Sequence, residues 1–452
     1  MAKLLRSRSV GFALLIAVAS GQVFALDPVE LTDDGGWCWF QDERAIVCGD
    51  KLVVGSVATG GDDKSRVGDV QAVVFDLLTG DKQLVELHDR LGADDHNAPA
   101  FAVLPGQRLL AIYATHGATN SFWYRVSAGG DFTQWSEARE FVPTSDSRIT
   151  YSNVFRLRGE RGRVFNFYRG YAASFKPSFA TSDDEGESWQ NGGVFLRVPD
   201  EFRHRPYVKY ASDGVDTIHM VYTNGHPRNY DNSLYHAFYR AGKLHRSDGE
   251  KIASLEQGID RPELGTLVFA GDAENVAWPC DLHLDAEGRP VVVYSVQKDR
   301  PGLPPGAPQS GADHRYRYAA WNGSGWLDAE MAFAGSRLYP KEDDYTGLAC
   351  LDPDDVSTVY ISTNAQPATG EPLVSDADGR RHYEIFRAKT ADGGNSWTWT
   401  AVTRNSTTDN LRPMVPKWRR EKTALLWLRG TMRTYTDYEL SPMVLVVEAG
   451  GD

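Results

Sequence analysis

Two nine-residue stretches of the sequence follow the same pattern, and this repeat limits the possible folds more than any other feature. TSDDEGESW ends at Trp189 and KTADGGNSW ends at Trp397, and both fit Ser/Thr-x-Asp-x-Gly-x-Ser/Thr-Trp. SAGGDFTQW, which ends at Trp135, keeps part of the pattern. The tryptophans are 54 and 208 residues apart, so the second interval is close to four times the first. A unit that returns at such intervals predicts a fold built from repeated modules.

The rest of the chain alternates between short strand-like runs and turn signals. VQAVVFDLLTG, RLLAIYATHG, RVFNFYRG and RPVVVYSV are rich in Val, Ile and aromatic residues, and they end in Gly or polar residues or border on them. After the first 25 residues, no stretch shows a sustained helical period. The 43 glycines and 12 tryptophans suit tight turns between sheets that pack through aromatic side chains. The pattern predicts an all-β fold.

The tryptophan-ending pattern resembles the Asp-box, or BNR repeat. In that repeat a hairpin turn is capped by the aspartate side chain, and the tryptophan packs between the sheets of a β-propeller. The resemblance implies a single β-propeller. At roughly 55 to 65 residues a blade, the chain after its first 25 residues has room for seven blades, with six as the alternative. Loops of several blades would meet over the centre, where we expect the functional site.

The first residues have the pattern of a secretory signal peptide. Three cationic residues precede an apolar run from Gly11 to about Ser20, and VFA at 23–25 fits a small-x-small cleavage site. The apolar run is shorter than the roughly 20 residues that span a bilayer. We therefore expect residues 1–25 to be removed and residues 26–452 to form a catalytic propeller domain. The protein is expected to be secreted or periplasmic.

The net charge limits the classes of partner that the protein can bind. A formal charge of -13 argues against nucleic acid or an anionic membrane as a partner. It does not exclude an acidic substrate, because a local cationic cleft can lie on an acidic body. Nothing in the sequence indicates the oligomeric state.

Four cysteines leave the disulfides open. They are Cys38, Cys48, Cys280 and Cys350. An exported protein could form two disulfides from them, one of which would join Cys38 to Cys48. Spacing alone does not assign the pairs.

Imidazoles, tyrosines and arginines stand repeatedly at the ends of strand-like runs, next to Gly or Pro. The blocks that carry them are, in chain order, DDHNAPAF, YATHG, TYSNVFRL, FYRG, RPYVKY, NGHPRN and NSLYHAFY. Because functional residues of such folds lie on the loops between strands, we expect these side chains to gather over the centre of the propeller.

A histidine, a tyrosine and an arginine together suit one reaction of acidic sugars. An arginine can bind a uronate carboxylate through two parallel hydrogen bonds and turn it into an electron sink. A neutral histidine or an ionised tyrosine can then accept the C5 proton, while a tyrosine hydroxyl or an imidazolium protonates the leaving O4 oxygen. The reaction is a β-elimination that yields an unsaturated uronate. It requires no covalent nucleophile and no cofactor.

Together with GWCWFQDERAIV, these blocks are similar in order and spacing to the propeller-type polysaccharide lyases, specifically the ulvan lyases and their relatives. The similar blocks run from about Trp37 to Asp285. The resemblance implies an enzyme that cleaves a uronate-containing polysaccharide, such as the sulfated rhamnose-uronate polymer ulvan, by β-elimination. An acidic polysaccharide is therefore the expected partner.

The resemblance also implies catalytic roles for four residues. His96 matches the histidine at the scissile bond, and His116 matches a second active-site imidazole. Tyr151 matches the tyrosine proposed as acid or base, and Arg169 matches the arginine that neutralises the uronate carboxylate. The roles of His96 and Tyr151 as base and acid can be exchanged. The 18-residue interval from Tyr151 to Arg169 is slightly longer than expected, and RGERGR can absorb the excess as a turn.

Four further residues are predicted substrate contacts with weaker support, because RPY and HPR also serve as rigid turns. They are Asn97, Arg205, Tyr207 and Arg228.

Two other functions stay open. A sialidase would need an early Arg-Ile-Pro-type motif, and neither Arg-Ile-Pro nor Arg-Leu-Pro occurs near the start of the expected mature chain. The alternatives are therefore an exo-acting, sialidase-like glycoside hydrolase and a propeller that binds carbohydrate without reacting with it.

A metal site is only weakly indicated. WPCDLHLD contains Cys280, Asp281 and His283, and His226 or His236 could join them from another blade. Side chains alternate along a strand, so Asp281 and His283 point one way and Cys280 the other. These residues alone do not form a complete site, although the resemblance is compatible with a structural zinc or calcium ion.

Overall fold

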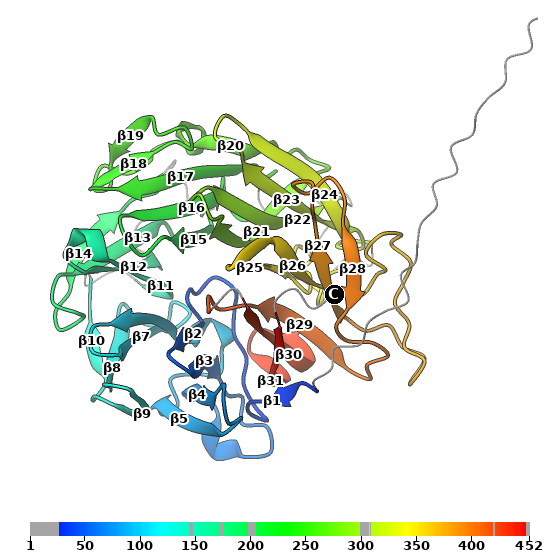
Figure 1. The fold of residues 1–452 in the computed structure, drawn as a ribbon, viewed down its shortest axis with the longest axis horizontal. Helices are drawn as coiled ribbons and strands as arrows, with labels where there is room; N and C mark the ends of the chain where they lie inside the picture. The colour runs from blue at the N-terminus through cyan, green and yellow to red at the C-terminus, as the bar shows by residue number, and fades with distance from the viewer. Residues whose placement is uncertain are drawn as a thin grey trace, which may run out of the picture.

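The protein is a seven-bladed β-propeller. The computed structural model describes residues 27–143, 148–170, 175–197, 205–228, 230–298, 307, 309–418 and 421–448. In these ranges the chain forms 31 β-strands, four short 3-10 helices and no α-helix. The strands form seven sheets arranged around a central axis (Figure 1). This confirms the all-β fold and the count of seven blades rather than six.

Each blade is an antiparallel sheet of strands that follow one another along the chain. The first contains β2 (Ala45–Cys48), β3 (Lys51–Val57), β4 (Val70–Asp76) and β5 (Lys82–His88). The second contains β6 (Ala100–Leu104), β7 (Arg108–Ala114), β8 (Phe122–Ala128), β9 (Asp131–Trp135) and β10 (Arg139–Phe141). The third contains β11 (Ile149–Leu157), β12 (Arg163–Gly170), β13 (Pro177–Ser182) and β14 (Gln190–Val194).

The fourth blade is the largest. It contains β15 (Val208–Ser212), β16 (Thr217–Thr223), β17 (Leu234–Arg240), β18 (Lys243–His245), β19 (Lys251–Ser254) and β20 (Thr266–Phe269). The fifth contains β21 (Val276–Leu284), β22 (Pro290–Gln297), β23 (His314–Trp321) and β24 (Trp326–Gly335). The sixth contains β25 (Ala349–Asp352), β26 (Asp355–Thr363), β27 (Glu384–Lys389) and β28 (Thr398–Ala401). The 3-10 helices are η1 (Lys64–Arg66), η2 (Asp95–Asn97), η3 (Arg158–Glu160) and η4 (Pro262–Leu264).

The seventh blade closes the ring with strands from both ends of the described chain. It contains β29 (Asp409–Met414), β30 (Lys422–Thr434), β31 (Asp437–Glu448) and, at its outer edge, β1 (Val29–Glu30). Val29 pairs with Val444, and Glu30 pairs with Met443. The beginning of the described chain thereby holds its last blade in place.

The cores lie between neighbouring blades, and β12 shows how one strand serves two of them. Phe165 and Phe167 belong to the core shared with the fourth blade, whereas Val164 and Tyr168 belong to the core shared with the second. Successive side chains of a strand point to opposite faces. A strand buried on both faces is apolar at nearly every position, which explains runs such as RVFNFY.

The first complete Asp-box forms the turn between β13 and β14. Asp184 accepts hydrogen bonds from the backbone N and the hydroxyl of Ser188, at 2.8 and 2.5 Å. Trp189 then packs edge-on against Phe122 of the preceding blade, with ring centroids 5.3 Å apart. The turn therefore fixes the tryptophan between two blades, as the resemblance implies.

The second complete copy, between β27 and β28, repeats this geometry. Asp392 accepts from the backbone N and the hydroxyl of Ser396, at 2.9 and 2.6 Å. Trp397 packs against Tyr318 of the preceding blade at 5.2 Å. Gly394 has a φ of +98°, and a Cβ there would lie 2.7 Å from the Tyr318 ring, which explains the glycine in the pattern.

In the partial copy, which ends at Trp135, the aspartate bonds to a residue that is closer in the sequence. Asp131 accepts from the backbone N and the hydroxyl of Thr133, two residues ahead rather than four. The segment forms the short strand β9 beside β8. Trp135 still lies between blades, since it packs with the core shared by the first two.

Residues 37–44, which we call the central segment, lie at the inner ends of several blades. The segment donates hydrogen bonds from Cys38 N to Asp95 O of η2 (3.0 Å), from Trp39 Nε1 to Pro279 O of β21 (3.1 Å) and from Asp42 N to Ser152 O of β11 (3.3 Å). It accepts hydrogen bonds from Lys209 Nζ of β15 to Trp39 O (2.7 Å) and from Arg412 Nη1 of β29 to Trp37 O. Lys209 is fully buried and also pairs with Asp42 at 2.6 Å. The central segment therefore braces the middle of the ring.

The four cysteines are unpaired, so the disulfides left open by the sequence are not formed. Cys38 lies in the central segment near His96, whereas Cys48 packs in the core between the first two blades. The pair that is close in sequence is thus separated by the fold.

The expected signal peptide, residues 1–25, lies outside the described residues. Within the described part of the chain, no helix combines the length and the apolar character needed to cross a bilayer.

Candidate active site

Two stacked imidazoles lie at the centre of the candidate site. His96 is the middle residue of η2, just before β6, and His116 follows β7 of the same blade. Because β6 and β7 are antiparallel, the hairpin returns His116 to the end where His96 lies. The two rings are parallel within 5°, and their centroids are 3.8 Å apart. The structure thus brings together two predicted histidines from the two ends of one hairpin.

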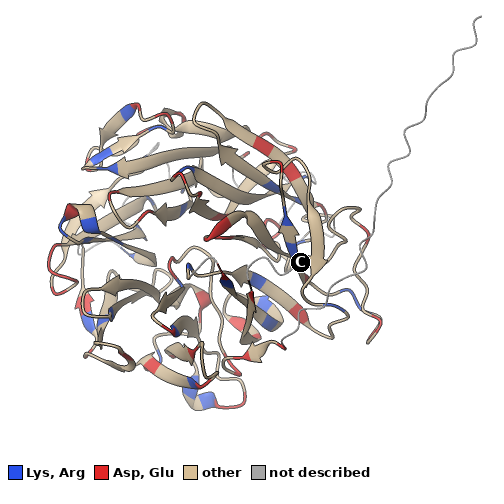
Figure 2. Ribbon diagram, in the orientation of Figure 1, with Lys and Arg blue, Asp and Glu red and all other residues tan. Residues whose placement is uncertain are grey.

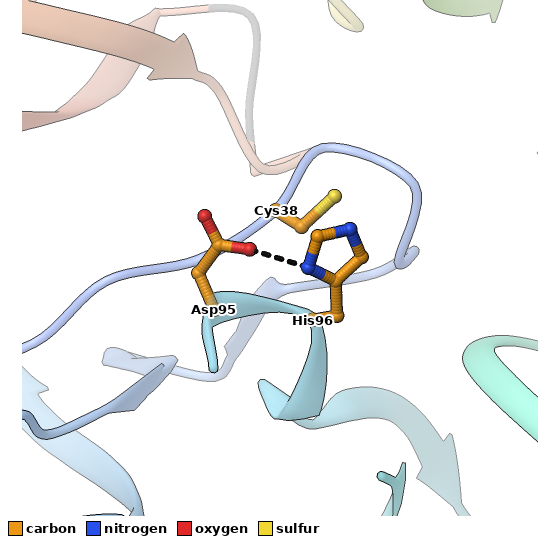
Figure 3. Close-up of side chains that lie close together, drawn as sticks. All are labelled: Cys38, Asp95 and His96. Atoms are coloured by element: carbon orange, nitrogen blue, oxygen red, sulfur yellow. Dashed lines mark ion pairs between the residues drawn. The ribbon is translucent and has the colours of Figure 1, made fainter. Parts of the chain in front are cut away.

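Asp94 joins the two imidazoles. One of its carboxylate oxygens lies 2.7 Å from Nδ1 of His96, and the other lies 3.0 Å from Nδ1 of His116. Asp94 also caps η2 by accepting a hydrogen bond from the backbone N of His96. Asp95 adds a second carboxylate 2.8 Å from the same Nδ1 (Figure 3). Asp95 is itself paired with the buried Arg412. The imidazole of His96 therefore lies between two carboxylates.

Tyr151 reaches the imidazoles from an irregularity in β11. The register of β11 against β12 shifts between Thr150 and Asn153, and Tyr151 has a φ of 64°. This backbone conformation is uncommon for tyrosine and turns the side chain away from the regular strand direction. Its ring centroid lies 5.4 Å from that of His96. Strain of this kind is characteristic of functional positions.

Arg169 lies beside Tyr151 on the neighbouring strand. It pairs with Thr150 in the register of β11 and β12. Its guanidinium carbon is 4.9 Å from the ring centroid of Tyr151 and 4.8 Å from that of Tyr207, distances typical of cation-π contacts. Between the two strands, η3 and the turn after it take up the RGERGR stretch, where the sequence predicts the extra residues.

The predicted substrate contact Tyr207 lies on the same wall. Its ring is 6.2 Å from that of Tyr151 and 5.5 Å from that of His226. Arg205 is partly buried, and its guanidinium carbon lies 5.5 Å from the ring centroid of Phe175. Two cations therefore border one ring, because Arg169 approaches Phe175 to 5.9 Å.

The other two predicted contacts are placed differently. Asn97 is 2% exposed, and its amide donates to the backbone oxygen of Gly92 at 2.9 Å. Arg228 forms ion pairs with Glu342 and, at 3.4 Å, with Asp344. Asn97 therefore braces a loop, and the charge of Arg228 is balanced by the protein. The sequence contained no sign of these partners, and the role of both residues as substrate contacts stays a prediction.

Tyr435 belongs to the site, and sequence reasoning missed it. It lies in the turn between β30 and β31, and its ring stands edge-on to His96 and His116 at 5.2 and 5.4 Å. Its backbone oxygen accepts from the N of Asp95 at 3.0 Å. No local sequence pattern marks this tyrosine. It belongs to the last blade of the chain, far in sequence from the two histidines. Asp94 was also missed, although the DDHN stretch contained it.

The comparisons with known proteins agree with this architecture. The profile described as "BNR repeat-containing family member" matches residues 67–334, more than half of the chain. The chain belongs to the BNR repeat-containing family. No curated protein sequence matched this BNR-repeat protein.

Solved structures show the same fold in polysaccharide lyases. One is a PL25 ulvan lyase bound to a saccharide of glucuronic acid linked 1-4 to 3-sulfated rhamnose, with a TM-score of 0.66 and 16% identity over 94% of this chain and 96% of that chain. Another is a polysaccharide lyase with a TM-score of 0.60 and 12% identity, covering 94% of this chain and all of that chain. The similarity to ulvan lyases that the sequence blocks indicated is thus confirmed for the fold.

The two imidazoles of the BNR-repeat protein are electrostatically unequal. Burial opposes charge on His96, but Cys38 and Tyr151, followed by Asp94 and Asp95, raise its pKa well above the ordinary value. Burial and the charge of His96 lower the pKa of His116 to about 4, against the attraction of Asp94. Burial, with Tyr207 beside it, raises the pKa of Tyr151 well above its usual range, so this phenol keeps its proton at neutral pH.

Opposite charges are interspersed over the blades, as Figure 2 shows. Beside the imidazoles, Glu342 and Asp344 form an acidic pair whose pKa values are raised to about 7 and about 6, first by burial. Arg169 and Arg205 add two cations beside the ring of Phe175.

The predicted metal candidates do not gather into one group among the described residues. His226 lies with Glu342 and Asp344, two carboxylates already paired with Arg228, so this set fits a cation poorly. His283 pairs with Asp281 at 3.4 Å, on the side of β21 that alternation predicts.

Two more groups of potential ligands share His96 but have other roles. They are Cys38 with Asp95, and Asp94 with His116. Nδ1 of His96 is held at hydrogen-bonding distance from a carboxylate, whereas a metal would need that nitrogen as a bare ligand about 2 Å away. We assign no metal to these residues.

Proposed function

We propose that this protein is an exported polysaccharide lyase that cleaves a uronate-containing polysaccharide of the ulvan type by β-elimination. The polysaccharide-lyase fold supports the class of enzyme, and the signal-peptide pattern at residues 1–25 supports export. The substrate is an acidic polysaccharide, and neither nucleic acid nor a membrane is involved.

The proposal is carried by one observation, the meeting of four side chains on adjoining blades. His96 and His116 stack on each other, Tyr151 lies 5.4 Å from His96 between ring centroids, and Arg169 lies against Tyr151. These are the groups that β-elimination from a uronate requires: a cation for the carboxylate, a proton acceptor and a proton donor.

The chemistry follows from these groups. Arg169 binds the uronate carboxylate and stabilises the negative charge that develops there when C5 loses its proton. A neutral imidazole accepts that proton, and the electron pair of the C5–H bond forms the C4–C5 double bond. The C4–O4 bond breaks, and O4 leaves with a proton from an acid of the site. Tyr151 suits that role because its raised pKa keeps the phenol protonated.

The direct test is an assay on ulvan that follows two products at once. We expect ultraviolet absorbance from the unsaturated uronate to rise together with reducing ends, and we expect no change with a neutral polysaccharide. Reducing ends without absorbance would replace the proposal with a glycoside hydrolase. Binding of ulvan without either signal would replace it with a carbohydrate-binding propeller.

A tyrosine pair tests the site. Tyr151→Phe should lower kcat/KM about 10²-fold or more, because the proton donor is lost while the ring packing remains. Tyr239→Phe is the matched control, since its hydroxyl bonds Glu160 on an outer part of the third and fourth blades. Full activity of the Tyr151 variant would contradict its assignment as the acid.

A further inference from the structure

One carboxylate serves two imidazoles in this site. Each oxygen of Asp94 faces one Nδ1 atom, at 2.7 Å for His96 and 3.0 Å for His116. An ionised carboxylate only accepts hydrogen bonds, so both Nδ1 atoms must carry hydrogen. The proton state of each ring is then decided at its Nε2 atom.

The stacking disfavours a charge on both rings in the resting site. The centroids are 3.8 Å apart and the rings are parallel. Two imidazolium ions at this distance in a buried site repel each other. At rest, therefore, at most one ring is an imidazolium, and the other is neutral, with a lone pair on Nε2.

The surroundings decide which ring holds the charge. Nδ1 of His96 has a second carboxylate, Asp95, at 2.8 Å, while His116 has only Asp94. His116 also feels the positive charge of Arg169. In addition, the His116 side chain is 23% exposed and that of His96 only 5%, so His116 is the ring that a ligand can reach.

We propose that Asp94 is a positioning residue that keeps His96 as an imidazolium and His116 as a neutral imidazole, so that Nε2 of His116 accepts the substrate proton. The catalytic part of this inference rests on the proposed lyase function, whereas the two proton states do not. It assigns the base to His116 and leaves His96 as a fixed positive charge beside the reacting uronate.

The remaining titratable groups near the pair come from other elements. The groups that face His96 from the central segment, β11, the loop before β25 and the turn after β30 are Cys38, Tyr151, Tyr339, Glu342 and Tyr435. Arg412 of β29 lies behind Asp95. Arg412 is bound to Asp95 at 2.6 Å, so its charge is already matched. The carboxylates at Nδ1 are the charged groups in closest contact with His96.

The proton balance closes around this arrangement. Nε2 of His116 takes the C5 proton and becomes cationic beside His96, where Asp94 offsets the added charge. Tyr151 gives its hydroxyl proton to O4 as the C4–O4 bond breaks. After the products leave, His116 releases a proton to solvent and Tyr151 takes one up, which restores both groups.

The test is an NMR titration of the imidazole nitrogens in the full protein between about pH 5 and 8. Variants His96→Gln and His116→Gln assign the signals. We expect imidazolium shifts for His96 throughout and a neutral, Nδ1-protonated ring for His116. A neutral His96 or a charged His116 at pH 7 would overturn the inference, whatever the substrate proves to be.

Asp94→Asn tests the positioning role. The variant should lose the Nδ1-protonated preference of His116, and kcat/KM should fall about 10²-fold with an altered pH profile. Asp94→Glu should restore part of both signals. Asp183→Asn, on the exposed outer side of the third blade, is the control for loss of an ion-paired aspartate. Unchanged His116 signals in a folded Asp94→Asn variant would contradict the role, even if the wild-type protein acted on no uronate.

Discussion

Two walls of the candidate site use the same residue types in opposite ways. On the wall of the second and third blades, Asp94 lies between two imidazoles and Arg169 lies over tyrosine rings. On the facing wall, two carboxylates, Glu342 and Asp344, are paired with the single guanidinium of Arg228. The arginine of the first wall thus packs on aromatic rings, and the arginine of the second wall balances two carboxylates of the protein.

The difference shows why residue type alone does not identify a binding group. Arg169 and Arg228 both follow strand-like runs in the sequence and look equivalent there. Only the partners supplied by distant loops separate an arginine that packs on aromatic rings from one that balances two carboxylates.

Exchanging each arginine for lysine gives the strongest test of this comparison. Arg169→Lys should lower kcat/KM by about 10²- to 10³-fold, because lysine cannot form the two parallel hydrogen bonds to the substrate carboxylate. Arg228→Lys should cost activity less than about tenfold and mainly lower Tm, since its partners are protein carboxylates. Activity assays and thermal melts of both variants decide it. Equal losses would abolish the distinction between the walls.

The buried carboxylates of the second wall, Glu342 and Asp344, should make the stability of the protein depend on pH. The pKa of Glu342 is raised from 4.5 to about 7, first by burial and then by Asp344. A raised carboxyl pKa stabilises the fold fully below the unfolded value, and this contribution is lost as pH rises through 7. The free energy of unfolding of Glu342→Gln relative to wild type should therefore rise between about pH 4.5 and 7, by on the order of 1–3 kcal/mol.

Denaturant titrations at several pH values measure this difference. Glu187→Gln, on an exposed turn of the third blade, is the matched control. A difference in unfolding free energy that stays constant between about pH 4.5 and 7 would show that burial does not raise the pKa of Glu342.

The smallest effect is expected at Tyr435, which stands edge-on to both imidazoles. Tyr435→Ala should raise KM by about threefold to tenfold, because edge-on aromatic contacts contribute roughly 0.5–1.5 kcal/mol. Tyr435→Phe should stay close to wild type, since the ring and not the hydroxyl makes the contact. Initial rates against substrate concentration measure the effect, and a larger loss for Phe than for Ala would contradict it.

The fold could be predicted because its signals are local. The bonds from Asp184 to Ser188 and from Asp392 to Ser396 each lie within one turn, so a nine-residue pattern contains them completely. The number of blades follows from the spacing of such turns. The 3-10 helix η2, which positions His96, had no such signal, because its cap on Asp94 resembles many other polar turns.

The site could be predicted only where neighbouring strands form it. His96 and His116 meet because one hairpin joins them, and the structure places Tyr151 and Arg169 on the next blade. Tyr435 and Glu342 come from loops more than 200 residues away from the two histidines in the sequence, and the placement of such loops depends on closing the whole ring. Whether Cys38 and Cys48 pair could not be read from the sequence for the same reason, since the fold places Cys38 in the central segment and Cys48 in the core between the first two blades.

The order in which the chain is made bears on when the site can exist. The imidazole pair rests on Asp95, which needs Arg412 for its charge and the backbone of Tyr435 for its amide, and both belong to the blade that β1 completes. An emerging chain therefore lacks a finished site until its final strands have been synthesised and docked. Activity should appear only when folding is complete, so partly synthesised chains are expected to be inactive.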